Sequence, residues 1–94
     1  MNTAAEILQD LGISEKGAIR SFALLNASQK LAEFHQECMA FLHKYDMTFS
    51  EFEKNIKSRQ EEIFTEEEDY IAWKFADEGT AYWREKVEQL KREQ

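Results

Sequence analysis

The 94-residue sequence contains no proline, only three glycines and a single cysteine. Proline and glycine build most of the turns that a β-sandwich or β-barrel needs, so their scarcity argues against a many-stranded fold. One cysteine, Cys38, cannot form an internal disulfide framework and fits a reducing compartment. No apolar run approaches the roughly 20 residues of a membrane-spanning helix, and the first residues lack the pattern of a signal peptide. We therefore expect a cytoplasmic protein without a membrane segment.

The chain is rich in helix-forming, charged and aromatic residues. Hydrophobic residues make up 43% of it, charged residues 33% and aromatic residues 13%. The aromatic content argues against disorder, because that much ring surface can drive folding or binding. The length fits a single domain over residues 1–94, with a thin core, because a chain this short buries only about 60–65% of its unfolded surface. We expect an all-α fold, a small helical bundle or helical hairpin of about four helices, two of them long.

Local capping signals divide the chain into helices. The pattern Ser/Thr-x-x-Glu indicates helix starts at Thr3, Thr48 and Thr65. Ser14 is a further N-cap, and Gly12 is placed to end the first helix in a left-handed conformation. Together these signals predict helices over residues 4–11, 15–45, 49–63 and 66–92.

The apolar residues of the two long segments have helical spacing. Leu24, Leu31, Cys38 and Tyr45 repeat every seven residues, and further apolar residues widen their stripe. The stripe is broader than a two-stranded coiled-coil seam, so we expect this helix to pack on two or more neighbours. One candidate neighbour is a second copy of the chain, bound through the Leu24–Tyr45 helix of each.

In the last helix and in the short third helix, residue spacing also indicates which face is buried. Gly79 lies alongside the apolar seam of the last helix, where glycine lowers helix stability, and together with Ala76 it indicates close approach of another helix. In the third helix, Lys54, Lys57 and Arg59 fall mostly on the side expected to face solvent. The seam residues of the last helix step by three and four: Trp73, Ala76, Thr80, Trp83, Val87 and Leu90.

Few residues point to catalysis or to metal binding. His35 and Cys38 stand one turn apart, but a tetrahedral metal site needs two more ligands. No acid lies three positions before His35 or His43, as the Glu-x-x-His pairs of di-iron bundles require. No phosphate-binding glycine loop and no Ser-His-Asp order is present. We expect no enzyme activity, no catalytic residue, no metal and no cofactor; the alternative is an enzyme or metal carrier that uses His35 and Cys38.

Negative charge is concentrated in one short segment. The formal charge is −7, which disfavours direct binding to nucleic acid or to an anionic membrane. Residues 61–78 hold eight acids and one base, so the whole excess lies there. In one interpretation the acids favour the positive end of a helix dipole and the rings face the core. In the other, the segment docks on a basic partner protein. The residues expected to bind that partner are Glu61, Glu62, Phe64, Glu66, Glu67, Asp69, Tyr70, Trp73 and Trp83.

Several of these features occur together in a known family. The run from Lys44 to Phe52, the acidic stretch that ends in Asp69, and Trp73 and Trp83 ten residues apart resemble small acidic all-helical antitoxin-like proteins. Such proteins belong to prokaryotic toxin–antitoxin gene pairs of archaea and cyanobacteria. The resemblance covers roughly residues 5–92 and implies a non-enzymatic antitoxin that neutralises a cognate basic toxin, often an RNA-cutting enzyme, by occluding its surface. The alternative is a homo-oligomeric structural module.

Overall fold

The computed structural model describes residues 2–93, and over these residues the chain forms four helices and no strand. The all-α fold with two long helices is thereby confirmed. No helix in this part of the chain is both long and apolar enough to cross a lipid bilayer. The helices are α1 (Thr3–Asp10), α2 (Glu15–Tyr45), α3 (Phe49–Ser58) and α4 (Phe64–Arg92).

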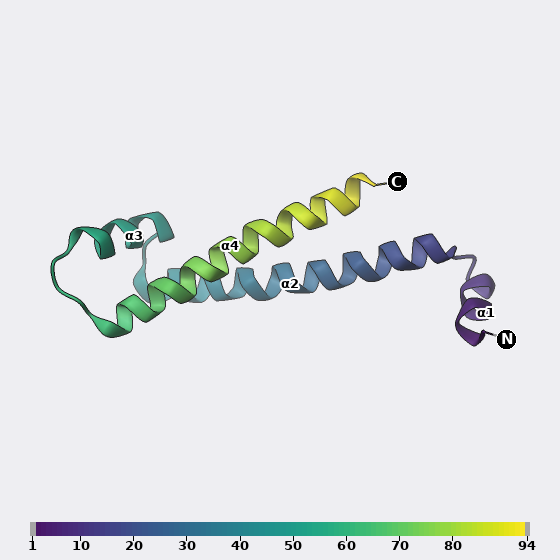
Figure 1. Ribbon diagram of the computed structural model, residues 1–94, viewed down its shortest axis with the longest axis horizontal. Coiled ribbons are helices and arrows are strands. Elements are labelled where there is room, and N and C mark those ends of the chain that lie inside the picture. Colours follow the sequence, from purple (N-terminus) through teal and green to yellow (C-terminus); the bar gives the residue numbers. More distant parts are fainter. Residues whose placement is uncertain (1, 94) are drawn as a thin grey trace.

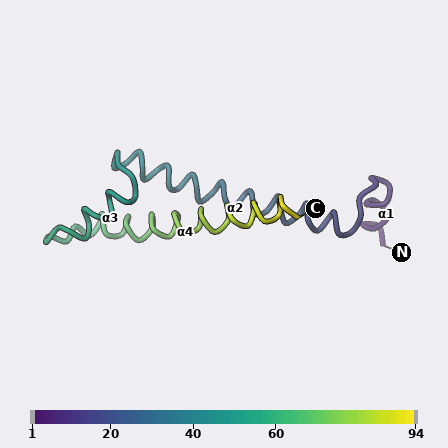
Figure 2. The backbone as a smooth tube through the Cα atoms, turned by 90° about the horizontal axis from the view of Figure 1, so that it is seen from above, coloured from purple at the N-terminus to yellow at the C-terminus, as the bar shows by residue number. Residues whose placement is uncertain are grey.

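The two long helices, α2 and α4, form an elongated antiparallel hairpin. α3 covers the end where α2 stops and α4 begins, and α1 projects beyond the opposite end (Figure 1). Figure 2, the view from above, shows α4 running beside α2 for most of its length. The molecule measures 66 × 24 × 18 Å with a radius of gyration of 19.7 Å. A compact domain of this length would have a radius of gyration of about 12 Å. A large share of the side chains is therefore exposed to solvent.

The hairpin is held along a heptad seam. Buried and half-buried side chains alternate in steps of three and four on both helices, which is the spacing of a two-stranded antiparallel coiled coil. As predicted, α2 packs on more than one neighbour: it contacts α4, α1 and, through Tyr45 and Phe52, α3. α4 is the main neighbour, and α1 and α3 contact α2 only near its ends. The seam residues of α2 are Arg20, Leu24, Ala27, Leu31, Phe34, Cys38, Phe41 and Tyr45.

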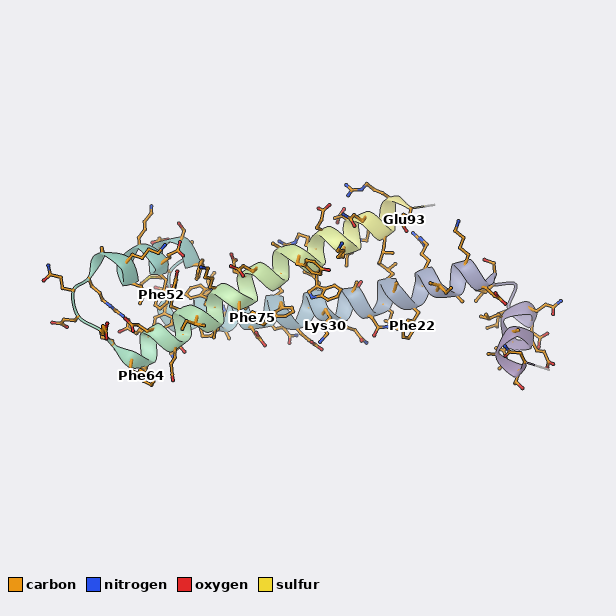
Figure 3. All side chains as sticks on the ribbon, in the orientation of Figure 1. Phe22, Lys30, Phe52, Phe64, Phe75 and Glu93 are labelled. Carbon is orange, nitrogen blue, oxygen red and sulfur yellow. The ribbon has the colours of Figure 1, made fainter. Side chains whose placement is uncertain are left out.

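The best-packed part of the core is an aromatic cluster around Trp73, at the end of the hairpin that α3 covers. Trp73 is 2% exposed, and its ring centroid lies 5.6 Å from that of Phe41 and 5.2 Å from that of Phe52. Phe49 approaches the same indole edge-on at 5.4 Å, and Tyr45 stacks on it at 6.1 Å. Figure 3 shows Phe52 on the side of α3 that faces the hairpin. The cluster thus joins α2, α3 and α4.

Two of the predicted helix starts are confirmed. The hydroxyl of Ser14 accepts a hydrogen bond from the Gly17 backbone N–H at 2.9 Å. Thr48 and Glu51 form the reciprocal capping box, with the Glu51 N–H donating to Thr48 Oγ1 at 3.2 Å. Gly12 adopts the left-handed conformation (φ 70°) expected of it, and Asp46, at the end of α2, adopts it too (φ 51°).

The other two helix starts differ from the predictions. α1 is capped by Asn2, whose side chain accepts from the Ala5 N–H, so Thr3 lies inside the helix. Asparagine is a stronger N-cap than threonine, which accounts for the shift of one residue. α4 begins at Phe64 with Ile63 as its N-cap and without a side-chain cap, so the predicted box at Thr65 is wrong. Glu66 and Glu67 in the first turn favour the dipole of this helix instead.

The predicted extent of the third helix, residues 49–63, is also too long. α3 ends at Ser58, and Arg59 already has an extended backbone. The residues that follow, 60–62, are a glutamine and two glutamates without an apolar side chain to bury. A helix is stabilised mainly by burying an apolar face, and such a face is missing here. Residues 59–63 instead form the link that brings α4 back to α2.

Candidate protein-binding surface

The acidic segment begins in the link before α4. Glu61 and Glu62 are exposed there, and Phe64, the first residue of α4, is 74% exposed. Figure 3 shows Phe64 at the extreme end of α4, directed away from the hairpin. Glu67, one turn further on, is half-buried. Glu61, Glu62 and Phe64 are therefore accessible to a partner, as the docking interpretation requires.

Asp69, another of the predicted binding residues, is engaged within the chain. Lys44 Nζ lies 2.5 Å from Asp69 Oδ2, and the Tyr45 hydroxyl donates to the same oxygen. The pKa of Asp69 is lowered, first by the hydrogen bond from Lys44 and then by that from Tyr45. Burial, and next the hydrogen bond to Asp69, raise the pKa of Tyr45. Asp69 thus ties the start of α4 to the end of α2.

Glu66 and Arg59 form a second internal contact of the acidic segment. Arg59 Nη1 lies 3.2 Å from Glu66 Oε1, and the Arg59 side chain is only 22% exposed. The prediction that Arg59 faces solvent is wrong. The link between α3 and α4 folds back towards the first turn of α4, where the carboxylate attracts the guanidinium. Glu66 therefore stabilises this turn, and its carboxylate is already paired with Arg59 within the chain.

The two predicted ring anchors nearest the acids also face inwards. The Tyr70 hydroxyl donates to Glu53 Oε2 at 2.7 Å, and its ring stacks on Phe49 with centroids 5.8 Å apart. The hydrogen bond to Glu53, and next burial, raise the pKa of Tyr70. Trp73 is the centre of the aromatic cluster. Trp83 is half-buried in the seam and meets Tyr82 edge-on at 5.1 Å. Of these three rings, Trp73 is closed to a partner in this conformation.

A second stripe runs along the face of α4 that lies outside the seam, where the ring of Phe75 meets that of Phe34 on α2 edge-on, with centroids 5.5 Å apart. We call it the outer stripe. Four of its side chains are large, apolar and mostly exposed, at 74, 68, 64 and 54% from the first to the last. A hollow of about 400 Å³ lies at its middle, between Ile71, Phe75 and neighbouring polar side chains. The residues of the outer stripe are Phe64, Glu68, Ile71, Phe75, Glu78 and Tyr82.

Most of the outer stripe was not predicted from the sequence. Only Phe64 was among the expected binding residues, whereas Ile71, Phe75 and Tyr82 were not. The signal was present, because α4 carries a second set of large apolar residues, spaced by seven, four and seven, beside the set that steps by three and four. The two sets differ by roughly 130° around the helix, and the set that contains both tryptophans packs inwards.

Of His35 and Cys38, the other candidate site, Cys38 lies in the seam and His35 is exposed beside it. The Cys38 sulfur is 3.5 Å from Thr80 Oγ1, and the Thr80 hydroxyl donates to the Ala76 carbonyl at 2.8 Å. Within residues 2–93, no three His, Cys, Asp or Glu side chains are grouped so that they could hold a metal ion. The thiol therefore packs as a small side chain between α2 and α4.

The stripe from Leu24 to Tyr45, considered for pairing with a second copy, faces α4 within the same chain. Self-association through it would require the hairpin to open.

Comparison with protein-family models found no match, and comparisons with curated proteins and with solved structures found none either.

Proposed function

We propose that this protein is a non-enzymatic protein-binding module, and specifically an antitoxin that neutralises a basic toxin by covering its surface. The observation that supports this proposal is the exposure of four large apolar side chains among the acids of α4. Single exposed apolar residues are common on any protein surface. Several aligned on one helix, and interrupted by carboxylates, are typical of a surface that another protein covers.

The apolar side chains supply the binding free energy in this proposal. Fully burying a leucine-sized or phenylalanine-sized side chain contributes about 1.5–3 kcal/mol. Phe64 and Tyr82 mark the ends of the stripe, which spans 19 residues of helix and so about 27 Å from end to end. A row of that length fits within a standard-size protein–protein interface, which buries about 800 Å² of each partner. The rings are the anchors, and their burial would slow dissociation.

The exposed carboxylates supply the selection of a basic partner. Glu61, Glu62 and Glu68 remain exposed although Glu66 and Asp69 are paired within the chain. A basic surface is what an RNA-cutting toxin needs, because lysine and arginine contact the phosphates of RNA. Carboxylates that cover these bases would steer association and occlude the RNA site at once.

The proposal is tested by isolating the tagged protein from its native host and identifying the protein bound to it in stoichiometric amount. We expect a basic protein whose toxicity, or whose RNA cleavage, is suppressed when the two are mixed. A tightly bound protein that is acidic, or one whose activity is unaffected, would contradict the antitoxin assignment.

A homo-oligomeric structural module is the second candidate function. The observation that favours it is a group of exposed apolar residues on α2, Ile19, Phe22 and Leu25, which lies outside the seam. Sedimentation velocity of the purified chain distinguishes the two functions. A dimer that persists at nanomolar concentration and binds no other protein would favour the structural module.

A further inference from the structure

The apolar side chains of the outer stripe have the spacing that one helix presents to another. Phe64, Ile71, Phe75 and Tyr82 are separated by seven, four and seven residues. Residues at such intervals form a nearly straight row along a helix, and a row of this kind accommodates the knobs of a second helix laid beside it. An extended strand or a loop would match only part of the row.

Two carboxylates stand within this row rather than beside it. Glu68 lies between Phe64 and Ile71, and Glu78 lies between Phe75 and Tyr82. Both side chains are exposed, and neither forms an ion pair with any side chain of residues 2–93. A helix that covers the row must therefore bring a positive charge to each end of it, since desolvating an unpaired carboxylate is costly.

A second copy of the chain meets the apolar part of this requirement but not the charged part. The seven-four-seven spacing is the same in both directions, so an antiparallel copy would set Phe64 against Tyr82 and Ile71 against Phe75. The same alignment sets Glu68 against Glu78 at both ends of the contact. A parallel copy sets each glutamate against its own equivalent. Like charges opposed at an interface disfavour the complex, so the row selects against self-pairing.

We infer that the outer stripe binds an amphipathic helix of the partner, laid along α4, with apolar residues at heptad spacing and with lysine or arginine opposite Glu68 and Glu78. The hollow of about 400 Å³ beside Ile71 and Phe75 receives one of the apolar side chains of that helix. This inference rests on the proposed function and names the element of the basic partner that the surface recognises.

The direct test uses a synthetic helical peptide and the full-length protein. The basic peptide carries leucines spaced to meet the four apolar residues and lysines opposite Glu68 and Glu78; the matched peptide has glutamates in place of those lysines. We expect the basic peptide to bind at least tenfold more tightly, by fluorescence anisotropy at low salt. Equal binding of the two peptides, or binding of neither, would overturn the inference.

Protein variants show where the peptide binds. Ile71→Ala should weaken binding of the basic peptide at least tenfold, whereas Phe22→Ala, at an equally exposed position on α2, should leave it unchanged. The double variant Glu68→Lys with Glu78→Lys should reverse the preference towards the acidic peptide. Circular dichroism on each variant verifies the helix content. A preference that is not reversed, or a Phe22→Ala effect as large as that of Ile71→Ala, would overturn the inference.

The single variant Glu68→Lys gives an independent measurement. In the antiparallel alignment it replaces two like-charge contacts by two opposite-charge contacts, so we expect it to dimerise at concentrations at which the unmodified chain is a monomer. A dimer of the unmodified chain that Ile71→Ala dissolves would overturn the inference in favour of a second copy. If the native partner binds equally well to Ile71→Ala, the inference fails and the antitoxin proposal stands. If the peptide results hold and no basic partner is found, the antitoxin proposal fails.

Discussion

Gly79 of α4 lies against the ring of Phe34 on α2, so closely that a Cβ atom on residue 79 would stand 2.6 Å from Phe34 Cδ1. A close helix approach at this glycine was predicted from the sequence, and the structure confirms it. The absence of a side chain at residue 79 lets the ring of Phe34 fill the seam. The helix therefore tolerates a residue of poor helix propensity in the middle of α4 because the packing needs the space.

Gly79→Ala should lower the free energy of unfolding by about 1 kcal/mol. Overpacking a helix contact costs about 1–3 kcal/mol, and the better helix propensity of alanine returns up to about 1 kcal/mol. Urea denaturation measures the change. In the background of Phe34→Ala the ring is absent, and the same substitution should then be neutral or stabilising. A loss of stability in both backgrounds would show that Phe34 is not the obstacle.

Thr48→Ala should destabilise the fold by about 1 kcal/mol, because it removes the hydroxyl that accepts from the Glu51 N–H. Thr65→Ala is the matched control, since Thr65 lies in the first turn of α4 and provides no cap. Its denaturation midpoint should stay within a few tenths of 1 kcal/mol of the unmodified protein. Equal effects of the two substitutions would contradict the assignment of the caps.

Trp73→Ala should cost about 3–5 kcal/mol of stability, because it empties the centre of the aromatic cluster. Trp83→Ala should cost clearly less, since Trp83 is only half-buried. Thermal unfolding monitored by circular dichroism compares the two. Equal losses would contradict the assignment of Trp73, rather than Trp83, to the best-packed part of the core.

Acid should destabilise the hairpin through Asp69. Its pKa is lowered in the folded state, so the folded chain prefers the ionised carboxylate and the unfolded chain binds the proton more tightly. The stabilisation is present above the unfolded pKa of about 3.9 and is lost as the pH falls through the lowered folded value. Asp69→Asn should be less stable at neutral pH and should show a flatter loss of stability below about pH 4. If Asp69→Asn lost stability below about pH 4 as steeply as the unmodified protein does, Asp69 would not be the source of the acid sensitivity.

Neutralising the exposed acids should slow association with the basic partner. In a triple variant of Glu61, Glu62 and Glu68 to glutamine, we expect a lower on-rate and a weaker dependence on salt. The difference from the unmodified protein should shrink above about 0.5 M salt, where the screening length is only a few ångströms. Surface plasmon resonance with the isolated partner measures both rates. If the variant were less stable but associated at the same rate, the acids would act only by stabilising the start of α4 through its helix dipole.

Features that depend on a few neighbouring residues were predictable from the sequence. Ser14 and Thr48 cap their helices through hydrogen bonds that span three residues, and Gly12 ends α1 with a conformation that only its own backbone sets. Such signals need no knowledge of the rest of the fold. The same reasoning was wrong at Thr65, because Ile63 begins the helix two residues earlier and the first-turn glutamates favour its dipole.

Which apolar and acidic side chains of α4 remain exposed was decided by the tertiary structure. The sequence predicted the inward row of α4, from Trp73 to Leu90, but not that the second row of large apolar residues, which Glu68 and Glu78 interrupt, would remain exposed. The inward choice comes from Trp73, which packs among rings that α2 and α3 bring to it from distant parts of the chain. That packing in turn places Asp69 beside Lys44 and leaves Ile71 exposed. Sequence determined that α4 is an amphipathic acidic helix, and contacts between residues far apart in the chain determined which of its side chains remain free for a partner.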